Sequence, residues 1–470
     1  MMFRLEQAQS WIEGSKLVGD PHYEVQRVCT DSRDAKAGDV FVPLVGERFD
    51  AHAFIGQVIG AGVRAVLSAQ SLSPDALIDG EVQRGVIHGL QVPDTTLALQ
   101  QLAAGWRSQF SLPVIAVTGS NGKTTVKEMI ASILRIAYGE AALSSQGNLN
   151  NGYGVPMSVL RLRSSHRAAV FELGINQVGE MAQLCPIAQP TLTLVNNAQR
   201  EHQEFLHGIE ASARENGAAI SQLQADGIAV FPGDDQCAPI WQSLAGHRLC
   251  VCFGWHDHWP VHASEVSASS FRLHCHGDDA MLTLRIAGRH NIRNAMAAAA
   301  CCQAIGVRFE DIVAGLEQFE PVGGRLRQIP LHGQALLIDD SYNANPDSVR
   351  AAIDVLAGVA GERFLVLGDM GEVGEQGDAF HEEVGVYART CGIEQLWLLG
   401  DASAHTARGF GAKARHFGSD VAALVDALKE SLNPDRLATA ATVLVKGSRF
   451  MAMERVVRAL TEDQHAKVAL

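Results

Sequence analysis

The sequence predicts an α/β protein built from three consecutive segments, residues 1–90, 91–321 and 322–470. Short runs of Val, Ile, Leu and Ala recur along the second and third segments, with helix-like periodicity between them. This alternation is typical of parallel sheets flanked by helices. Polar residues follow many of the apolar runs, at the strand ends where such sheets bind ligands.

The first segment mixes short apolar runs with turns. Residues 39–44 and 65–67 have the composition of strands. Two polar runs, Thr-Asp-Ser-Arg at 30–33 and Phe-Asp-Ala-His at 49–52, fall in expected loops. Ordinary loop chemistry explains these runs as well as ligand binding does, so the residues alone leave both interpretations open.

In the second segment, strands are expected with helices between them, at residues 114–117, 168–173, 191–195 and 228–231. Glu172 lies at the end of one strand, and Asn196-Asn197 follow another. The carboxyl ends of parallel strands share one edge of a sheet. We therefore expect a ligand site at this edge.

A glycine-containing loop joins the first of these strands to a predicted helix at residues 124–136. The run is Thr-Gly-Ser-Asn-Gly-Lys-Thr-Thr at residues 118–125, which we call the phosphate loop. Glycines let backbone N–H groups face phosphate oxygens, and the helix N-terminus adds its dipole. Lys123 can reach the β- and γ-phosphates, and the Thr124 hydroxyl can ligate Mg²⁺. The loop is a short variant, because Val117 stands where the longer motif has glycine.

The third segment alternates most regularly and predicts a Rossmann-like, doubly wound domain. Its expected strands are residues 335–338, 364–367, 396–399 and 443–445, and its expected helices are residues 346–359, 382–389, 421–432 and 451–460. The segment lacks a Gly-x-Gly-x-x-Gly run, which disfavours dinucleotide binding. Together with the phosphate loop, the pattern predicts a central P-loop-type ATPase sheet followed by this domain.

The composition argues against several classes of protein. The formal net charge is −14 without a basic stripe, so no nucleic-acid partner is expected. The most promising apolar run, residues 295–307, is too short to cross a membrane and is expected to be a buried helix. An apolar signal core is missing near the N-terminus, and the nine cysteines lack framework spacing. These features indicate a cytoplasmic protein without membrane insertion.

Histidines and cysteines are concentrated between Cys250 and His276, which raises the question of a metal site. The region has no Cys-x-x-Cys pair, and Cys250 and Cys252 alternate as on one face of a strand. A packed pair of strands is the favoured interpretation.

Further runs carry a resemblance to a known family. They are residues 147–156, 171–174, 288–295, 324–325, 339–346 and 368–372. With the phosphate loop, these runs resemble the Mur ligases over all three segments. The runs Asp-Asp-Ser-Tyr-Asn-Ala-Asn-Pro at 339–346 and Gly-Asp-Met-Gly-Glu at 368–372 are similar to those of the branch that uses D-alanyl-D-alanine.

The resemblance implies the three-domain Mur ligase architecture. Residues 1–90 would bind the UDP-sugar peptide, residues 91–321 would bind ATP, and residues 322–470 would form a mobile domain that closes the site. It also implies an ATP- and Mg²⁺-dependent ligase of peptidoglycan synthesis. Its partners would be two substrates, UDP-N-acetylmuramoyl-tripeptide and D-alanyl-D-alanine, which the enzyme would join by way of an acyl phosphate intermediate. We expect a monomer.

The resemblance also implies roles for individual residues. The implied catalytic residues are Lys123, Glu172, His202 and Arg325, and the implied metal ligands are Thr124, Glu172 and His202. The implied ATP-binding residues are Gly119, Ser120, Asn121, Gly122, Lys123, Thr124, Thr125, His290, Asn291, Asn294, Arg325 and Asp340. The implied substrate-binding residues are Thr30, Asp31, Ser32, Arg33, Asp50, Asn148, Asn150, Asn151, Tyr342, Asn343 and Asn345.

One feature of the resemblance is missing. Mur ligases usually carry a carbamylated lysine after the region of His202, but residues 211–217 read Ala-Ser-Ala-Arg-Glu-Asn-Gly, and no lysine occurs between Lys127 and Lys413. Arg214 stays protonated and forms no carbamate. We expect water, Asn216 or Glu215 to complete a second metal site.

Two other functions are compatible with parts of the sequence. Another Mur ligase or a folylpolyglutamate synthase would share the ATP-binding segment. A phosphate-loop ATPase that acts as a conformational switch would need no second small substrate. Release of ADP that depends on the second substrate separates the ligases from the switch.

Overall fold

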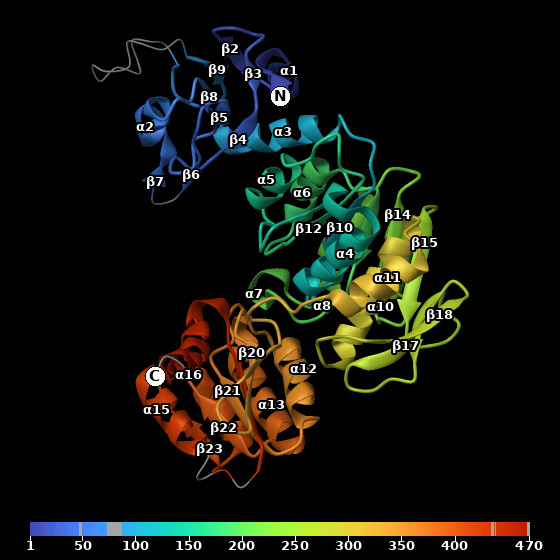
Figure 1. The fold of residues 1–470 in the computed structure, drawn as a ribbon, viewed down its shortest axis with the longest axis vertical. Coiled ribbons are helices and arrows are strands. Elements are labelled where there is room, and N and C mark those ends of the chain that lie inside the picture. Colours follow the sequence, from blue (N-terminus) through green and yellow to red (C-terminus); the bar gives the residue numbers. More distant parts are fainter. Residues whose placement is uncertain (47–48, 73–86, 434–436, 438, 468–470) are drawn as a thin grey trace.

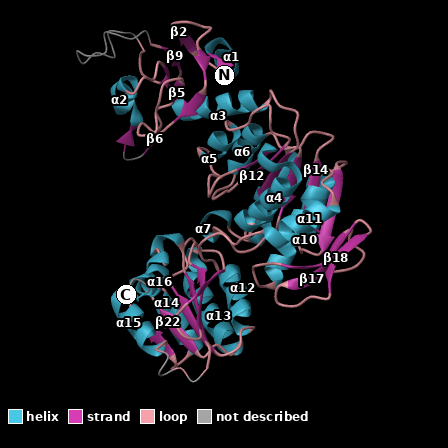
Figure 2. Cartoon of the chain, viewed as in Figure 1, coloured by secondary structure: helices cyan, strands magenta, loops and turns pink. Residues whose placement is uncertain are grey.

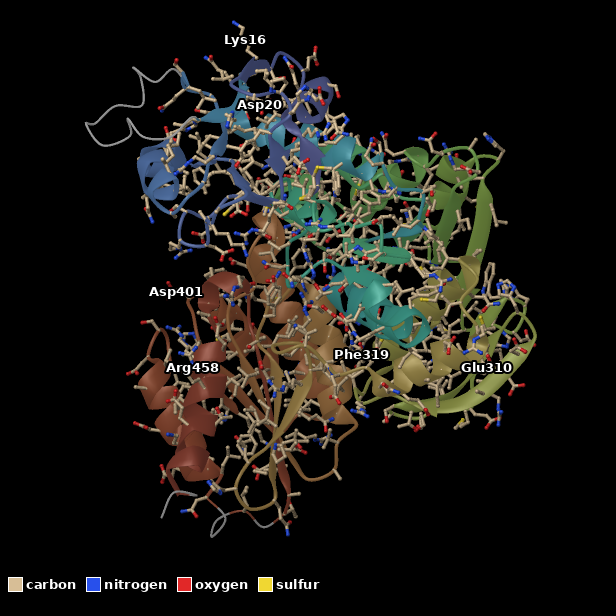
Figure 3. All side chains as sticks on the ribbon, turned by 45° about the horizontal axis from the view of Figure 1, so that its top comes forward. Lys16, Asp20, Glu310, Phe319, Asp401 and Arg458 are labelled. Carbon is tan, nitrogen blue, oxygen red and sulfur yellow. The ribbon has the colours of Figure 1, made fainter. Side chains whose placement is uncertain are left out.

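The computed structural model describes residues 1–46, 49–72, 87–433, 437 and 439–467. Three bodies follow one another along the chain, each on its own sheet (Figure 1). The first lies at one end, the C-terminal body lies at the other, and the middle body joins them. Lys16 and Asp20 lie in the first body, and Phe319 lies at the junction of the middle and C-terminal bodies (Figure 3).

The first body contains a five-stranded sheet in the order β2-β9-β8-β5-β4. The predicted strands at 39–44 and 65–67 are confirmed as β5 and β8, although β5 ends early, at Phe41. The strands are β2 Lys16–Val18, β4 Arg27–Cys29, β5 Asp39–Phe41, β8 Ala65–Ser68 and β9 His88–Gln91; two small pairs are β1 Phe3–Arg4 with β3 Glu24–Val25, and β6 Val45–Gly46 with β7 Phe49–Asp50. The helices are α1 Leu5–Trp11, η1 Ala51–Phe54 and α2 Ile55–Gly60.

The middle body is built on a nine-stranded sheet in the order β11-β12-β10-β13-β14-β15-β16-β17-β18. The predicted strands are confirmed as β10 Val114–Thr118, β12 Ala168–Glu172, β13 Leu192–Val195 and β14 Ile228–Pro232, and these four pair in parallel. The other strands are β11 Ala142–Ser144, β15 Leu249–Gly254, β16 Val261–Ser264, β17 Ser270–Cys275 and β18 Asp278–Thr283.

Helices cover both faces of the middle sheet, because the strands, such as β10, carry apolar residues on both faces. Ile115 and Val117 pack into one hydrophobic core, whereas Val114 and Ala116 pack into another, as alternation along a buried strand requires. The helices are α3 Thr95–Arg107, α4 Lys123–Tyr138, η2 Gly139–Ala141, α5 Gly154–Val159, α6 Glu180–Ala188, α7 Gln203–Leu206, α8 Ile209–Ser221, α9 Ala238–Ala245, α10 Arg289–Ala304 and α11 Phe309–Gln318.

The apolar run at 295–307 and the Cys/His-rich run have the predicted structures. Residues 295–302 are buried in α10, and within the described ranges no helix is long and apolar enough to span a membrane. Cys250 and Cys252 lie in β15, and β16 pairs with β17 so that the rings of His262 and His274 stack.

The C-terminal body has a six-stranded sheet in the order β19-β20-β24-β21-β22-β23, with helices on both faces (Figure 2). The strands are β19 Arg327–Pro330, β20 Ala335–Asp340, β21 Glu362–Leu367, β22 Gln395–Leu398, β23 Ala414–His416 and β24 Ala441–Lys446. The helices are α12 Pro346–Ala357, η3 Gly374–Gln376, α13 Gly377–Thr390, α14 Ser403–Phe410, α15 Val421–Ser431, η4 Arg449–Met451 and α16 Glu454–Lys467.

The predicted alternation of this body is confirmed, with three differences. The short helix α14 and strand β23 were not predicted, because Ser-Ala-His-Thr-Ala-Arg-Gly-Phe has too few apolar residues to show a period. The last helix begins at Glu454, since residues 449–451 form a 3₁₀ turn. Strand β19 adds an antiparallel edge to β20.

Candidate active site

The phosphate loop has the predicted strand–loop–helix structure. Strand β10 ends at Thr118, and α4 begins at Lys123. Gly122 has a φ of 81°, and a Cβ there would lie 2.8 Å from side-chain atoms of Asn196 and Asn294. Glycine is therefore required at this position both by the backbone conformation and by its neighbours.

The polar end of β13 braces the phosphate loop. The amide of Asn121 donates to Oδ1 of Asn197 at 2.9 Å, and the side chain of Asn196 donates to the carbonyl of Asn121 at 2.9 Å. The backbone of Ser120 donates to the carbonyl of Asn197. The loop is thus held open by side chains about 75 residues away along the chain.

Lys123 and Thr124 face carboxylates. Nζ of Lys123 donates to the carbonyl of Gly119 at 2.6 Å and to Oε2 of Glu201 at 3.1 Å. The Thr124 hydroxyl donates to Oε2 of Glu172 at 2.8 Å. The other oxygen of Glu172 accepts from Nδ2 of Asn150 at 2.8 Å. The loop therefore places one ammonium and one hydroxyl each against a buried carboxylate.

His202 reaches toward the C-terminal body. It has a φ of 44°, a left-handed conformation that is strained for a non-glycine residue. Its Nδ1 lies 2.6 Å from Oε2 of Glu372. The close contact with the His202 imidazole lowers the pKa of Glu372. A carboxylate of one body thus faces an imidazole of another.

A cavity of about 1070 Å³ lies between the middle and C-terminal bodies. It brings together most of the predicted site residues: Ser120, Asn121, Gly122, Lys123, Thr124, Thr125, Asn150, Asn151, Glu172, His202, His290, Asn291, Asn294, Arg325, Asp340, Tyr342, Asn343 and Asn345. Among the described residues, its lining includes neither Asn148 nor Gly119 nor any residue of the first body. The cavity is therefore assembled from the middle and C-terminal bodies, and no described residue of the first body lines it.

His290, Asn291 and Asn294, at the start of α10, form the wall beside the phosphate loop. Oδ1 of Asn294 accepts from Asn196 at 3.0 Å, and Nδ2 of Asn294 donates to Asn291 at 3.1 Å. Burial, with a smaller effect of Lys446, lowers the pKa of His290 to about 4. His290 is therefore neutral at pH 7.

The C-terminal body supplies Arg325 and Asp340. The guanidinium of Arg325 lies over the ring of Tyr342, 4.3 Å from its centroid. Oδ2 of Asp340 lies 2.7 Å from Nζ of Lys446, which also donates to the carbonyl of Asn343. Burial raises the pKa of Asp340, against the opposing effect of Lys446. Lys446 follows a predicted strand, yet its role as the counter-ion of Asp340 was not predicted.

Direct contacts join the middle and C-terminal bodies. Nδ2 of Asn345, the N-cap of α12, donates to Oδ1 of Asn121 at 2.9 Å. Arg200 binds Asp347 at 2.6 Å and Glu383 at 2.8 Å. We call Arg200, Asp347 and Glu383 the clamp. The sequence did not single out any of the three.

The predicted substrate residues of the first body are polar groups with local partners. Asp31 binds Arg33 at 2.6 Å, and hydrogen bonds from Arg33 lower the pKa of Asp31 to about 2. Asp50 accepts from the backbone and the ring of His52, which lowers the pKa of Asp50. Thr30 and Ser32 lie in the same turn, between β4 and β5. The structure does not bring these residues to the cavity.

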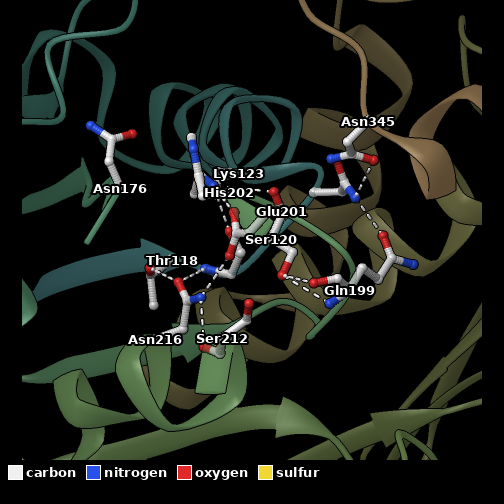
Figure 4. A network of polar contacts seen from close by, with 12 residues as sticks. Thr118, Ser120, Lys123, Asn176, Gln199, Glu201, His202, Ser212, Asn216 and Asn345 are labelled. Carbon is white, nitrogen blue, oxygen red and sulfur yellow. Dashed lines mark hydrogen bonds and ion pairs between the residues drawn. The ribbon is translucent and has the colours of Figure 1, made fainter. Parts of the chain in front are cut away.

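The segment without a lysine forms part of α8. Arg214 is exposed and pairs with Glu210, and the carboxylate of Glu215 accepts from the amide of Met181 at 3.0 Å. Asn216 is fully buried, and its Oδ1 accepts from the Thr118 hydroxyl at 2.6 Å and from the amide of Gly119 at 2.8 Å (Figure 4). Asn216 is thus a brace beneath the phosphate loop.

Glu201 is a site residue that the sequence analysis missed. It is 3% exposed and bridges Lys123 and Nδ2 of Asn216 (Figure 4). Its position next to His202 was the available signal, but a glutamate after a loop is ordinarily solvated. Only the fold shows that this one is buried against the phosphate loop.

The oxygen donors of Thr124 and Glu172 fit a hard cation such as Mg²⁺, which takes oxygen ligands. Within the described ranges, no three His, Cys, Asp or Glu side chains are grouped to hold a metal by themselves. A cation here would therefore also need the Thr124 hydroxyl, water or the oxygens of a bound phosphate. This chemistry matches a site that takes up its metal together with a nucleotide.

Two family profiles match the sequence. They are the Mur ligase middle domain, over residues 117–302, and the Mur ligase, glutamate ligase domain, over residues 324–449. A UDP-N-acetylmuramoyl-tripeptide–D-alanyl-D-alanine ligase of Escherichia coli (strain K12) is 40% identical over 447 residues, which make up 93% of this chain and 94% of that protein. The chain belongs to the Mur ligase family.

Other Mur ligases agree in sequence and in fold. A ligase of the same name from Haemophilus influenzae is 36% identical over 452 residues, 95% of this chain and 96% of that protein. The crystal structure of MurF from Acinetobacter baumannii superimposes with a TM-score of 0.89 at 36% identity, over 98% of this chain and 99% of that one. MurF from Thermotoga maritima in complex with ADP has a TM-score of 0.80 at 24% identity, over 94% of this chain and 99% of that one, which shows the shared fold.

These similarities confirm the predicted Mur ligase resemblance and its three-domain fold. The exact boundaries at residues 90 and 321 and the roles of single site residues stay predictions. The geometry around the phosphate loop is consistent with those roles in the middle and C-terminal domains.

Proposed function

We propose that this chain is an ATP-dependent ligase that joins D-alanyl-D-alanine to UDP-N-acetylmuramoyl-tripeptide and yields the UDP-N-acetylmuramoyl-pentapeptide of peptidoglycan synthesis. The observation that carries this proposal is the pairing of two facts. A phosphate loop with Lys123, Thr124 and Glu172 opens into an interdomain cavity, and relatives of this name match the chain over more than nine-tenths of its length.

The reaction needs an activated carboxyl group, because a carboxylate is a poor electrophile at neutral pH. An oxygen of the tripeptide carboxylate attacks the γ-phosphorus of ATP, and ADP leaves. The amine nitrogen of D-alanyl-D-alanine then attacks the acyl carbon of the acyl phosphate. Inorganic phosphate leaves with the bonding electrons, and the nitrogen loses its proton. One amide bond forms for each ATP consumed.

The residues of the middle domain serve the first step. Lys123 and the N-terminus of α4 place positive charge where the transferred phosphoryl group becomes more negative. Bound Mg²⁺ would neutralise further phosphate charge, and we assign Thr124, Glu172 and His202 to hold it. Lys123 and Thr124 are bonded to Glu201 and Glu172, so the binding of the phosphates and the cation would exchange these contacts on an otherwise braced loop.

The C-terminal domain completes the site. We assign Arg325 and Asp340 to the nucleotide, and Tyr342, Asn343 and Asn345 to the region of the incoming dipeptide. On the facing wall, His290, Asn291 and Asn294 of the middle domain would lie beside the adenine. Direct contacts between domains, through Asn345 and the clamp, would hold the C-terminal domain over the site, where closure would protect the acyl phosphate from hydrolysis.

The first domain would hold the long nucleotide-sugar end of the acceptor. We assign Thr30, Asp31, Ser32, Arg33 and Asp50 to this end, and Asn148, Asn150 and Asn151 to the region nearer the reacting carboxylate. We further propose a monomeric enzyme acting in the cytoplasm, where ATP is available and where its nine free cysteines stay reduced.

The experiment is a measurement of ADP release with UDP-N-acetylmuramoyl-tripeptide, with and without D-alanyl-D-alanine, combined with mass analysis of the product. We expect release that requires both substrates and a product heavier than the tripeptide by the dipeptide less one water. Release that ignores the dipeptide would favour the conformational switch. Release that requires a different amine would favour another ligase.

A further inference from the structure

Glu201 is a buried carboxylate without an assigned role in the proposed reaction. Its Oε2 lies 3.1 Å from Nζ of Lys123, and its Oε1 accepts from Nδ2 of Asn216 at 2.8 Å. The side chain is 3% exposed. A carboxylate this buried is costly unless it is paired, and Lys123 is the ammonium that pairs with it.

Asn216 fixes the position of this carboxylate. Its Oδ1 is committed to the Thr118 hydroxyl and the Gly119 amide, so its Nδ2 must face Glu201 and the carbonyl of Ser212. The amide cannot turn over without placing its NH₂ group against two donors. Glu201 is therefore held between Lys123 and Asn216, next to the phosphate loop, as Figure 4 shows.

Negative charge at the phosphate loop would exceed positive charge once a nucleotide without a cation binds. Phosphate oxygens must take Lys123, the cation that Glu201 now pairs with. Glu201 and Glu172, both buried, would then stand beside a polyphosphate. In a partly buried site, a unit charge several ångströms away alters binding by roughly tenfold or more.

We propose that Glu201 selects the cation-bound form of the nucleotide. It competes with phosphate for Lys123, and it repels a nucleotide that arrives without a divalent cation. A nucleotide bound to Mg²⁺ brings the charge that offsets this repulsion. Glu201 is thus a specificity-determining residue, and Asn216 is the positioning residue that aims it. This inference rests on the proposed role of Lys123 at the phosphates.

The test is ADP binding by equilibrium dialysis to the full-length protein, in excess Mg²⁺ and in excess EDTA. The ratio of the two affinities measures how strongly the cation and the nucleotide are coupled. For Glu201→Gln and Glu201→Ala, we expect affinity in EDTA to rise about tenfold and the ratio to fall by about the same factor. Loss of the carboxylate leaves Asn216 its bond to Ser212, so both variants should fold.

A control variant completes the charge series. Glu210→Gln removes an exposed carboxylate of the neighbouring helix and should leave the ratio unchanged. Thermal unfolding of each variant checks that it is folded.

Unchanged affinities in both Glu201 variants would overturn the proposal, and so would an equal loss in Mg²⁺ and in EDTA, since that would mean that Glu201 only steadies Lys123. Ligation by the wild-type protein is measured in parallel. Failure of wild-type ligation would count against the proposed function, whereas the ratio tests Glu201 independently of which amide is formed.

Discussion

The phosphate loop and the polar turns of the first domain are both candidate binding regions, yet they are built differently. Around the loop, Lys123, Thr124 and Asn216 each bind at least one partner that lies 48 to 98 residues away in the sequence, and most of these groups are buried. In the first domain, Asp31 and Asp50 bind residues only two positions away and are exposed. Contacts between distant segments therefore hold the phosphate loop in place, whereas contacts within each turn hold the polar turns of the first domain.

This difference predicts how each region responds to change. A substitution in a buried network disturbs several partners at once, and its effect on catalysis is large. A substitution in an exposed turn removes one local contact, and its effect is confined to the ligand that the turn binds. The following experiments test this contrast, beginning with the largest expected effect.

Replacing Lys123 with alanine should lower the ligation rate by about a thousandfold or more, because the ammonium opposes charge that develops on the phosphoryl group. The fold should be retained with a lower melting temperature, since the side chain lies at a helix start on the wall of the cavity but its loss leaves the buried Glu201 without its cation. Steady-state rates and circular dichroism check both points. Near-normal turnover by a folded variant would remove Lys123 from its assigned role.

Replacing Arg200 with alanine should weaken the contact between the middle and C-terminal domains. Hydrogen bonds to charged groups contribute about 2 kcal/mol, so closure should become less favourable by about thirtyfold. Small-angle scattering with saturating ATP and UDP-tripeptide should show a larger radius of gyration than in the wild type.

A matched control for the clamp is Arg214→Ala, which breaks only an exposed ion pair within α8. Its scattering and its turnover should match those of the wild type, because exposed pairs contribute little. Equal radii for Arg200→Ala and the wild type under saturating ligands would show that the clamp does not hold the domains together.

Replacing Asp31 with asparagine should raise KM for the UDP-tripeptide by about tenfold or less and leave kcat and the melting temperature nearly unchanged, because its ion pair with Arg33 is exposed. The pKa of Asp31 is held at about 2, so its charge is lost only as pH falls toward that value. KM should therefore show no titration of Asp31 between pH 5 and 9. A large drop in kcat would contradict the assignment of this turn to binding alone.

The smallest effect is expected from bicarbonate. Arg214 is exposed and paired with Glu210, and Asn216 braces the loop, so α8 offers no amine that CO₂ could modify. Activity measured after degassing at mildly acidic pH should equal activity after bicarbonate is restored. A marked rescue would mean that a carbamate forms on a lysine elsewhere in the chain.

Much of the fold could be predicted because it depends on local sequence. The strand at 114–117, the loop and the helix after it follow from apolar residues, glycines and a Lys-Thr pair that are adjacent in the chain. The strands of the C-terminal domain were predicted for the same reason. Helix α14 was missed, because all of its core-facing residues except Phe410 are small or polar, and only packing against α13 makes them a buried face.

The sequence by itself determined the α/β class, the phosphate loop and the family resemblance, since each depends on residue types at fixed short spacings. The tertiary structure alone decided that Glu201 is buried against Lys123, that Asn216 aims it, that Lys446 pairs with Asp340, and that Arg200 bridges two domains. The residue type of a charged side chain does not by itself reveal whether that side chain is solvated or buried. Core packing determines which distant segments lie together, and so determines the partner of each charged side chain. That partner sets the free-energy cost of burying the charge and the chemistry the side chain can perform.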